Sequence, residues 1–191
     1  GLDQKRLRQQ LHEIERLRKK YRQIKILKGS EVDILLSGDL DFDNKILSQF
    51  DIVIASVHSA FKSPEKEMTK RIIKALENKY VTILAHPTGR IINRRPPYAV
   101  DLEQIFEIAR EKKKLLEISA QTQRLDLNDI NIKLAKEKGV EFVINTDSHS
   151  TEQLNWMLLG VSQARRGWIE KSDVVNTLKF RDLSKRLKLE I

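Results

Sequence analysis

The sequence contains no cysteine, few aromatic residues and no long run of apolar side chains. The absence of cysteine excludes a disulfide scaffold, a cysteine nucleophile and any thiolate metal site, so a metal would have to be bound by His, Asp or Glu. No window approaches the roughly 18 consecutive apolar residues of a membrane span, and the N-terminus lacks the pattern of a secretory leader. We therefore expect a soluble, cytoplasmic protein that does not bind membranes.

The chain is rich in charge and basic overall. It has 191 residues, of which 40% are hydrophobic, and its 36 Lys+Arg against 27 Asp+Glu give a net charge of +9. This balance excludes a disordered chain, and the length predicts a single domain over residues 1–191. The positive charge favours a polyanionic partner such as DNA. Because the chain opens on Gly1 inside a helix-forming segment, we also expect it to be part of a longer protein.

Apolar residues alternate along the chain between helical and strand patterns. A stripe with a spacing of three or four predicts an amphipathic helix from residue 3 onward, and capping signals predict helices that begin at Ser63-Pro64, Asp101 and Asn128. Short apolar runs predict strands at 24–27, 31–34, 51–55, 81–85, 115–118 and 141–145. This alternation indicates an α/β fold with a largely parallel sheet of about five strands.

Three of the four histidines occupy the same position relative to predicted strands. His58, His86 and His149 each lie one to four residues after a strand ends, and in parallel sheets those ends meet at one face. A single histidine there is more often a capping or packing residue, but three together with Glu31 and Asp147 form a set typical of zinc, manganese or iron sites. His12 lies on the first helix, and we assign it no role.

Asp147 and His149 form a D-x-H pair. In extended backbone both side chains would point the same way and could bind one metal or two adjacent metals. Alternatively, Asp147 could cap a helix near Thr151 and orient His149. Asp33, on the same predicted strand as Glu31, is a further carboxylate near this face.

Four cations lie in loops after predicted strands and could bind substrate phosphates: Lys62, Arg90, Arg95 and Arg124. The alternative is that they are solvated or paired with nearby carboxylates, and the sequence does not separate the two. Other basic segments are spread along the chain, so charge alone does not locate a binding groove.

Several separated motifs together resemble one family. Residues 29–34, 55–59, 83–90 and 144–150 (GSEVDI, ASVHS, ILAHPTGR and INTDSHS) are similar to the PHP (polymerase and histidinol phosphatase) family. Residues 125–129 and 164–168 are most similar to the C-terminal PHP domain of bacterial and archaeal family X DNA polymerases.

The resemblance implies a distorted seven-stranded, TIM-like (β/α) barrel that binds up to three Mn²⁺ or Zn²⁺ ions through nine His, Asp and Glu ligands. By motif, Glu31 resembles the bridging carboxylate, His58 and His86 resemble middle ligands, and Asp147 and His149 resemble the final pair. The H-x-H motif of the first strand, the following Asp and the T-D-H ligand have no counterpart here. We therefore expect an incomplete barrel that lacks four ligands and exposes sheet edges, which favours self-association or partner binding.

The resemblance implies a metal-dependent phosphoesterase, in family X polymerases a 3′-5′ exonuclease that acts on DNA ends during repair. Its partners would be DNA and the N-terminal polymerase domain of the parent chain. Two alternatives remain open at this point. One is a small-molecule phosphatase of the histidinol-phosphatase type, and the other is a non-catalytic module that stabilises the polymerase domain.

Overall fold

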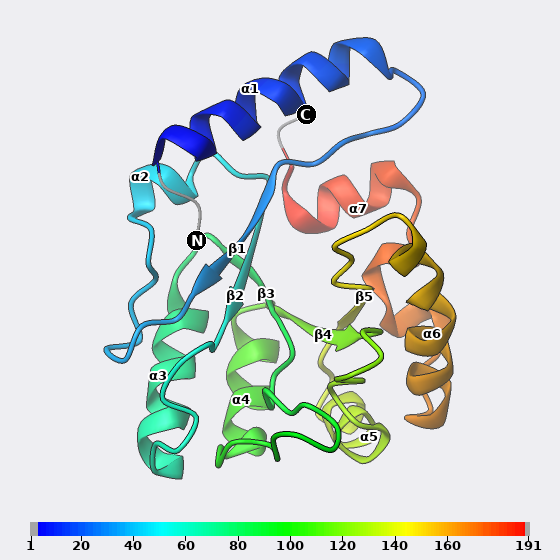
Figure 1. Cartoon of the computed structure of the whole chain (residues 1–191). Helices are drawn as coiled ribbons and strands as arrows, with labels where there is room; N and C mark the ends of the chain where they lie inside the picture. The colour runs from blue at the N-terminus through cyan, green and yellow to red at the C-terminus, as the bar shows by residue number, and fades with distance from the viewer. Residues whose placement is uncertain (1–3, 190–191) are drawn as a thin grey trace.

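The computed structural model describes residues 4–189, and its centre is one five-stranded sheet (Figure 1). All neighbouring strands are parallel, and they follow one another across the sheet in chain order. The strands are β1 (Gly29–Asp33), β2 (Ile52–Ser56), β3 (Val81–Leu84), β4 (Leu115–Ser119) and β5 (Phe142–Asn145). The predicted α/β fold with five parallel strands is therefore confirmed.

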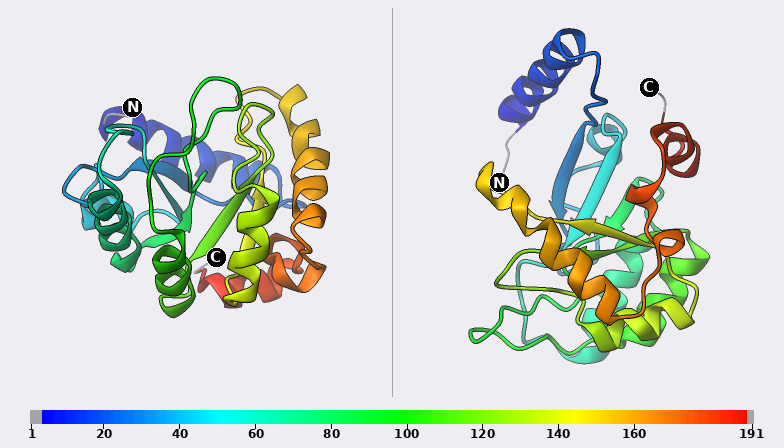
Figure 2. Two further views of the ribbon diagram at one scale, coloured as in Figure 1. Left: turned by 90° about the horizontal axis from the view of Figure 1, so that it is seen from below. Right: turned by 90° about the vertical axis from the view of Figure 1, so that its right-hand side faces the viewer.

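The helices surround the sheet in an arc. They are α1 (Gln4–Lys20), α2 (Asn44–Leu47), α3 (Glu65–Glu77), α4 (Leu102–Glu111), α5 (Asp129–Glu137), α6 (Met157–Arg166) and α7 (Phe180–Leu187). A sheet that always advances in the same direction carries its crossover helices on one side, as a (β/α) barrel does. Figure 2 shows α3, α4 and α5 along that side of the strands. None of the described helices is long and apolar enough to cross a membrane.

Alternate side chains of each strand enter two separate apolar layers. Val53 and Ala55 of β2 face the main core, which lies between the sheet and its helices. Ile52 and Ile54 of the same strand face the opposite side, where they belong to a second apolar cluster that also includes Ile83 of β3 and Leu183 of α7. Strands covered on both faces read as continuous apolar runs, which is why these segments were recognisable in the sequence.

Two of the three predicted helix caps are confirmed. The Asp101 side chain accepts a hydrogen bond from the backbone N–H of Gln104, and Asn128 caps α5 in the same way. The prediction that Ser63 caps α3 is wrong. Its hydroxyl donates to the carbonyl oxygen of Ala60 (2.9 Å) and closes the preceding turn, so Pro64 occupies the cap position without a side-chain hydrogen bond.

The predicted strand at 24–27 is also wrong, because this segment is irregular. Here and at the next residue, side chains in place of a neighbouring strand form hydrogen bonds with backbone groups. The Arg18 Nε donates to the carbonyl oxygen of Ile26 (2.7 Å), and the N–H of Lys28 donates to the Asp51 carboxylate (2.6 Å). Gly29, which lies between the predicted strands at 24–27 and 31–34, is the first residue of β1.

Gly160 marks a close approach between α6 and the sheet, and it gives a test of this packing. A Cβ at Gly160 would lie 2.5 Å from Ile144 Cγ2 and 2.8 Å from Ala120 Cβ. We predict that Gly160→Ala destabilises the protein by about 1–3 kcal/mol, as overpacked cores do. Helix propensity alone predicts that the same substitution stabilises the protein by about 1 kcal/mol. The sign of the measured change therefore shows whether the close packing at Gly160 is present. Chemical denaturation measures the change, and the exposed Ser162→Ala in the same helix should alter stability by less than about 0.5 kcal/mol.

Candidate metal centre

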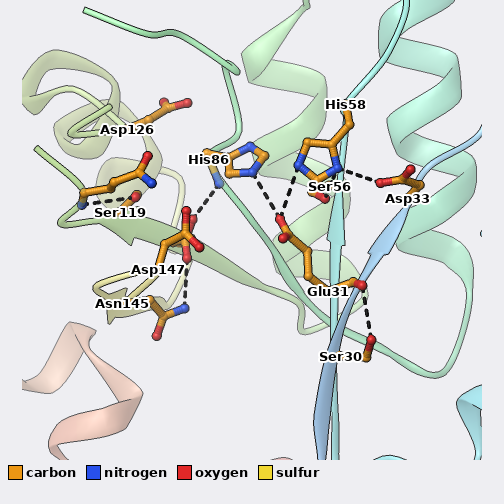
Figure 3. Close-up of polar contacts among 12 residues, drawn as sticks. Ser30, Glu31, Asp33, Ser56, His58, His86, Ser119, Asp126, Asn145 and Asp147 are labelled. Atoms are coloured by element: carbon orange, nitrogen blue, oxygen red, sulfur yellow. Dashed lines mark hydrogen bonds and ion pairs between the residues drawn. The ribbon is translucent and has the colours of Figure 1, made fainter. Parts of the chain in front are cut away.

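Three predicted ligands meet at the carboxyl ends of the first three strands. Glu31 lies in β1, and His58 and His86 each follow their strand by two residues. One ligand atom from each residue lies within 4.8 Å of those of the other two. Figure 3 shows the Glu31 carboxylate reaching toward both imidazole rings. The convergence expected from the parallel topology is therefore present for these three residues.

A buried arginine fixes the two loops that carry part of this cluster. Arg71 of α3 is 3% exposed. Its guanidinium donates to the carbonyl oxygens of Ile34, directly after β1, and of Ser59, directly after His58. Since a buried guanidinium is costly unless its donors are paired, these contacts hold both loops against α3.

Asp33 sets the orientation of the His58 ring. The His58 Nδ1–H donates to the Asp33 carboxylate (2.6 Å), and the hydroxyl of Ser56 lies 3.3 Å from the same nitrogen. The opposite ring nitrogen, Nε2, lies 3.6 Å from Glu31 Oε1. With Nδ1 carrying the proton, the lone pair on Nε2 faces the cluster. A metal-binding histidine usually donates its other ring N–H to a carboxylate in this way.

His86 contacts the same carboxylate from the other side. Its Nε2 lies 3.2 Å from Glu31 Oε1, and its buried Nδ1 has no hydrogen-bond partner among the described residues. Burial opposes ionisation of Glu31, but the hydrogen bond and charge of His86 outweigh it and lower the Glu31 pKa to about 2. Burial also disfavours the charged form of His86, yet its carboxylate neighbours raise the His86 pKa overall. Glu31 is thus ionised and available as an anionic ligand.

Glu117 of β4 is a central residue of the site that the sequence interpretation missed. Its carboxylate accepts hydrogen bonds from the backbone N–H of His86 (2.7 Å) and from Asn145 Nδ2 (3.0 Å). Burial raises the Glu117 pKa to about 7, although the charge of His86 lowers it. The available signal was a carboxylate within residues 115–119, a strand whose every position is buried.

His86 also has an unusual backbone. Its φ is +27°, in a region that residues other than glycine rarely adopt. Such residues cost on the order of 1–3 kcal/mol and persist where the surroundings hold them, often at functional sites. Here the bond from the His86 N–H to buried Glu117 supplies that constraint.

Asp147 and His149 do not share the predicted extended geometry. Asp147 has a φ of +49°, and the His149 Nδ1 lies 2.9 Å from the Asp147 carbonyl oxygen. Asp147 borders the same cavity as Glu31 and His86, and burial and the charge of Glu31 raise its pKa. The His149 side chain is 74% exposed and lies outside the three-residue cluster. The alternative cap is absent too, because no side chain caps the short helix after Thr151.

The structure separates the four predicted phosphate-binding cations. Arg90 donates to the carbonyl oxygens of Arg124 and Leu125, and Arg95 donates to that of Gly89. Lys62 is exposed to solvent. In Arg124, by contrast, Nε and Nη1 are buried without a hydrogen-bond partner in the described part of the chain. Its positive charge lowers the pKa of both His86 and Asp147.

A second buried carboxylate supports the loop after His86. Asp126 is fully buried and accepts hydrogen bonds from the N–H (3.0 Å) and hydroxyl (2.8 Å) of Thr88. The buried Tyr98 hydroxyl donates to the carbonyl oxygen of Pro87 (2.7 Å), so Tyr98 packs inside the fold and is not a stacking platform for bases. The sequence interpretation gave Asp126 no role.

The donor set fits a divalent metal ion. Ligand atoms about 2.0–2.2 Å from a common ion lie at most about 4.4 Å apart, so the cluster needs only a small contraction to bind one. Two imidazoles and a carboxylate suit zinc or manganese, and Asp33 provides the outer partner that orients a histidine ligand.

The parallel sheet, its one-sided helices and a His/Glu cluster at the strand ends place this chain in the (β/α)-barrel class of α/β proteins. No family model matches the chain. It is 47% identical over 188 residues to the "DNA polymerase/3'-5' exonuclease PolX" of Bacillus subtilis, an alignment that covers 98% of this chain and 33% of that protein. A probable phosphatase of Thermoanaerobacter sp. is 33% identical over 164 residues, or 81% of this chain and 64% of the relative. The chain thus spans a third of the first relative and under two thirds of the second.

Among solved structures, the fold is similar to that of a histidinol phosphate phosphatase from Lactococcus lactis complexed with zinc, L-histidinol and phosphate. The TM-score is 0.62 at 22% identity, over 89% of this chain and 76% of the other. Together these findings confirm the resemblance to the PHP family that is seen in the motifs.

The contact between Asp33 and His58 leads to a test of metal binding. We predict that Asp33→Ala weakens the binding of Zn²⁺ or Mn²⁺ by about 10- to 100-fold, the usual effect of removing the outer partner of a histidine ligand. Titration calorimetry with each ion measures the affinity. Asp39→Ala removes a carboxylate from the loop after β1 that pairs with Lys74, and it should leave the affinity within twofold. Equal effects of the two variants would contradict the assignment.

Proposed function

We propose that this chain is the metal-dependent phosphoesterase domain of a family X DNA polymerase and removes nucleotides from the 3′ ends of DNA. The observation that carries the proposal is the Glu31, His58 and His86 cluster in a chain that aligns almost completely with a protein named as a polymerase and 3′-5′ exonuclease. DNA and a polymerase domain in the same polypeptide are its proposed partners.

In this proposal, the ligands are Glu31, His58 and His86 of the cluster, together with Asp147 and His149, which lie outside it. A divalent cation such as Mn²⁺ or Zn²⁺ held there supplies Lewis-acid activation of water and of the phosphoryl group. Glu31 contributes the negative charge that holds the cation, and Asp33 keeps the His58 ring in the binding tautomer. The relative solved with zinc and phosphate supports this assignment. No serine or cysteine nucleophile is needed.

Arg124 is the proposed phosphate-binding residue. The other predicted arginines direct guanidinium groups to backbone carbonyls, and Arg90 thereby holds the segment that carries Arg124. A guanidinium with buried, unsatisfied N–H groups gains most from a bidentate phosphate. Its positive charge lowers the pKa of both His86 and Asp147, which supports a role for Arg124 at this site. Lys62 is exposed and is the remaining candidate of the original four.

The nuclease function is tested with a 5′-labelled oligonucleotide in Mn²⁺. We predict stepwise loss of 3′ nucleotides, and at least a 100-fold slower reaction for Glu31→Gln and His58→Ala, because each removes one ligand of the three-residue cluster. Glu103→Gln is the matched control, since Glu103 of α4 is exposed and pairs with Lys138 and not with a residue of the cluster, and it should keep full activity.

The same assay decides between the alternatives. Preferential hydrolysis of histidinol phosphate would indicate the small-molecule phosphatase, a possibility that the probable phosphatases among the relatives support. Absence of hydrolysis of both substrates by the metal-loaded chain would contradict the phosphoesterase proposal and favour the non-catalytic module.

Arg124 gives a separate prediction about substrate binding. Arg124→Ala should lower kcat/KM about 10- to 100-fold, mainly through KM, because one charged hydrogen-bonding group contributes about 1.5–3 kcal/mol. Steady-state kinetics measure the change. Arg94→Ala is the control, as Arg94 is exposed in the neighbouring loop, and it should change kcat/KM by less than threefold. Equal losses of kcat/KM in the two variants would contradict a specific role for Arg124 and would indicate that only the total positive charge of the loop matters.

A further inference from the structure

Most of the net charge of the protein belongs to its first segment. Residues 1–28 contain ten Lys/Arg and three Asp/Glu, whereas the remaining residues contain 26 Lys/Arg and 24 Asp/Glu. The net charge is thus +7 for the first segment and +2 for all the rest. Helix α1 and the loop after it account for residues 4–28 of this segment, so most of the positive charge lies on this helix and its loop.

Four cations form a row along the outer side of α1. Lys5, Arg8, Arg16 and Lys19 are all exposed, and at 3.6 residues per turn they lie within an arc of about 80°. The row is about 21 Å long, from 14 residues at 1.5 Å each. Lys5, Arg8 and Lys19 have no ion pair in the described structure, and Arg16 has only an exposed contact with Glu13 at 3.8 Å. We call these four residues the α1 cationic row.

Other basic segments are largely neutralised by their own surroundings. Lys112 pairs with Glu111, and the Lys114 ammonium donates to backbone carbonyls. Three cations near the C-terminus are paired as well: Arg166 with Asp129, Arg181 with Asp182 and Arg186 with Glu141. The α1 cationic row differs from these segments, because three of its four cations have no ion pair in the described residues and all four lie along one helix face.

The first turns of α1 lie next to the candidate metal centre. Arg6 and Gln10 border the same cleft as Glu31, Asp33 and His58. The apolar side of the helix is turned inward, and Leu7 is 3% exposed. A helix that has buried its apolar side in the protein cannot insert that side into a lipid bilayer, so its outer face suits an extended polyanion better than a membrane.

We propose that the α1 cationic row binds the phosphate backbone of a nucleic-acid strand and directs its 3′ end into the cleft beside Glu31 and His58. This inference rests on the proposed nuclease function for the direction of the strand. The site itself is rich in carboxylates, which repel phosphates. Cations outside the ligand set supply the attraction that such a site lacks.

The test compares two variants of the 191-residue chain with equal loss of charge. One replaces the row (Lys5→Gln, Arg8→Gln, Arg16→Gln, Lys19→Gln), and the control replaces four exposed lysines elsewhere (Lys45→Gln, Lys66→Gln, Lys70→Gln, Lys171→Gln). Fluorescence anisotropy measures binding of a 20-nucleotide single strand in EDTA, so that cleavage does not interfere. The row variant should bind at least about tenfold more weakly, with a salt slope reduced by up to about 2.8, and the control should stay within twofold.

Three results would overturn the inference: equal losses in the two variants, unchanged binding by the row variant, or row-dependent binding to phosphatidylserine vesicles without binding to the oligonucleotide. Circular dichroism confirms that both variants are folded.

Hydrolysis of bis(p-nitrophenyl) phosphate in Mn²⁺ distinguishes this inference from the proposed function. Row-dependent DNA binding without hydrolysis of any phosphoester would contradict the function alone, and hydrolysis with row-independent binding would contradict the row alone.

Discussion

A buried carboxylate on strand β4 connects the fold to its site. Glu117 of β4 bonds to the backbone after β3 and to the side chain of Asn145 at the end of β5. An ionised carboxylate loses a large hydration energy on burial, and two hydrogen bonds return only part of it. Burial raises the Glu117 pKa to about 7, which is the direct expression of that cost. Strand β4 thus loses stability but holds its two neighbours, β3 and β5, at fixed positions.

The same trade of stability for position recurs on the other side of the cluster. Arg71 is buried so that its guanidinium can bind the loops after β1 and β2, and His86 keeps an unfavourable backbone angle. Each of these features lowers the stability of the folded protein. They lie around one group of three side chains, Glu31, His58 and His86, whose ligand atoms they bring within 4.8 Å. The polar interior of this protein is therefore explained by the demands of the site and not by the demands of folding.

This distinction explains what the sequence could and could not predict. The strands and most helices follow from local apolar spacing and caps, and the convergence of Glu31, His58 and His86 follows from parallel topology. The irregular segment at 24–27 did not follow, because distant side chains bind the backbone there: Arg18 bonds to the carbonyl of Ile26, and Asp51 bonds to the N–H of the next residue after the segment, Lys28.

Long-range contacts also explain the remaining failures. Glu117 lies 31 residues from His86 in sequence, so local pattern gives no hint of their bond. The left-handed conformation of Asp147 likewise turns the D-x-H pair away from the extended geometry that alternation suggested. Sequence identified the residue types of the site, while the supporting hydrogen bonds required the fold.

The charge distribution follows from the same chemistry. A hard metal ion needs carboxylates and imidazoles close together, and a phosphate-rich substrate is repelled by the same carboxylates before an ion is present. Cations placed inside the cluster would pair with Glu31 or Asp33 and compete with the ion. Keeping one arginine, Arg124, at the border and most of the net charge on a separate helix avoids that competition. On this view, the acidic cleft and the basic helix beside it are two parts of one arrangement, in which attraction of the polyanion and binding of the cation are assigned to different elements.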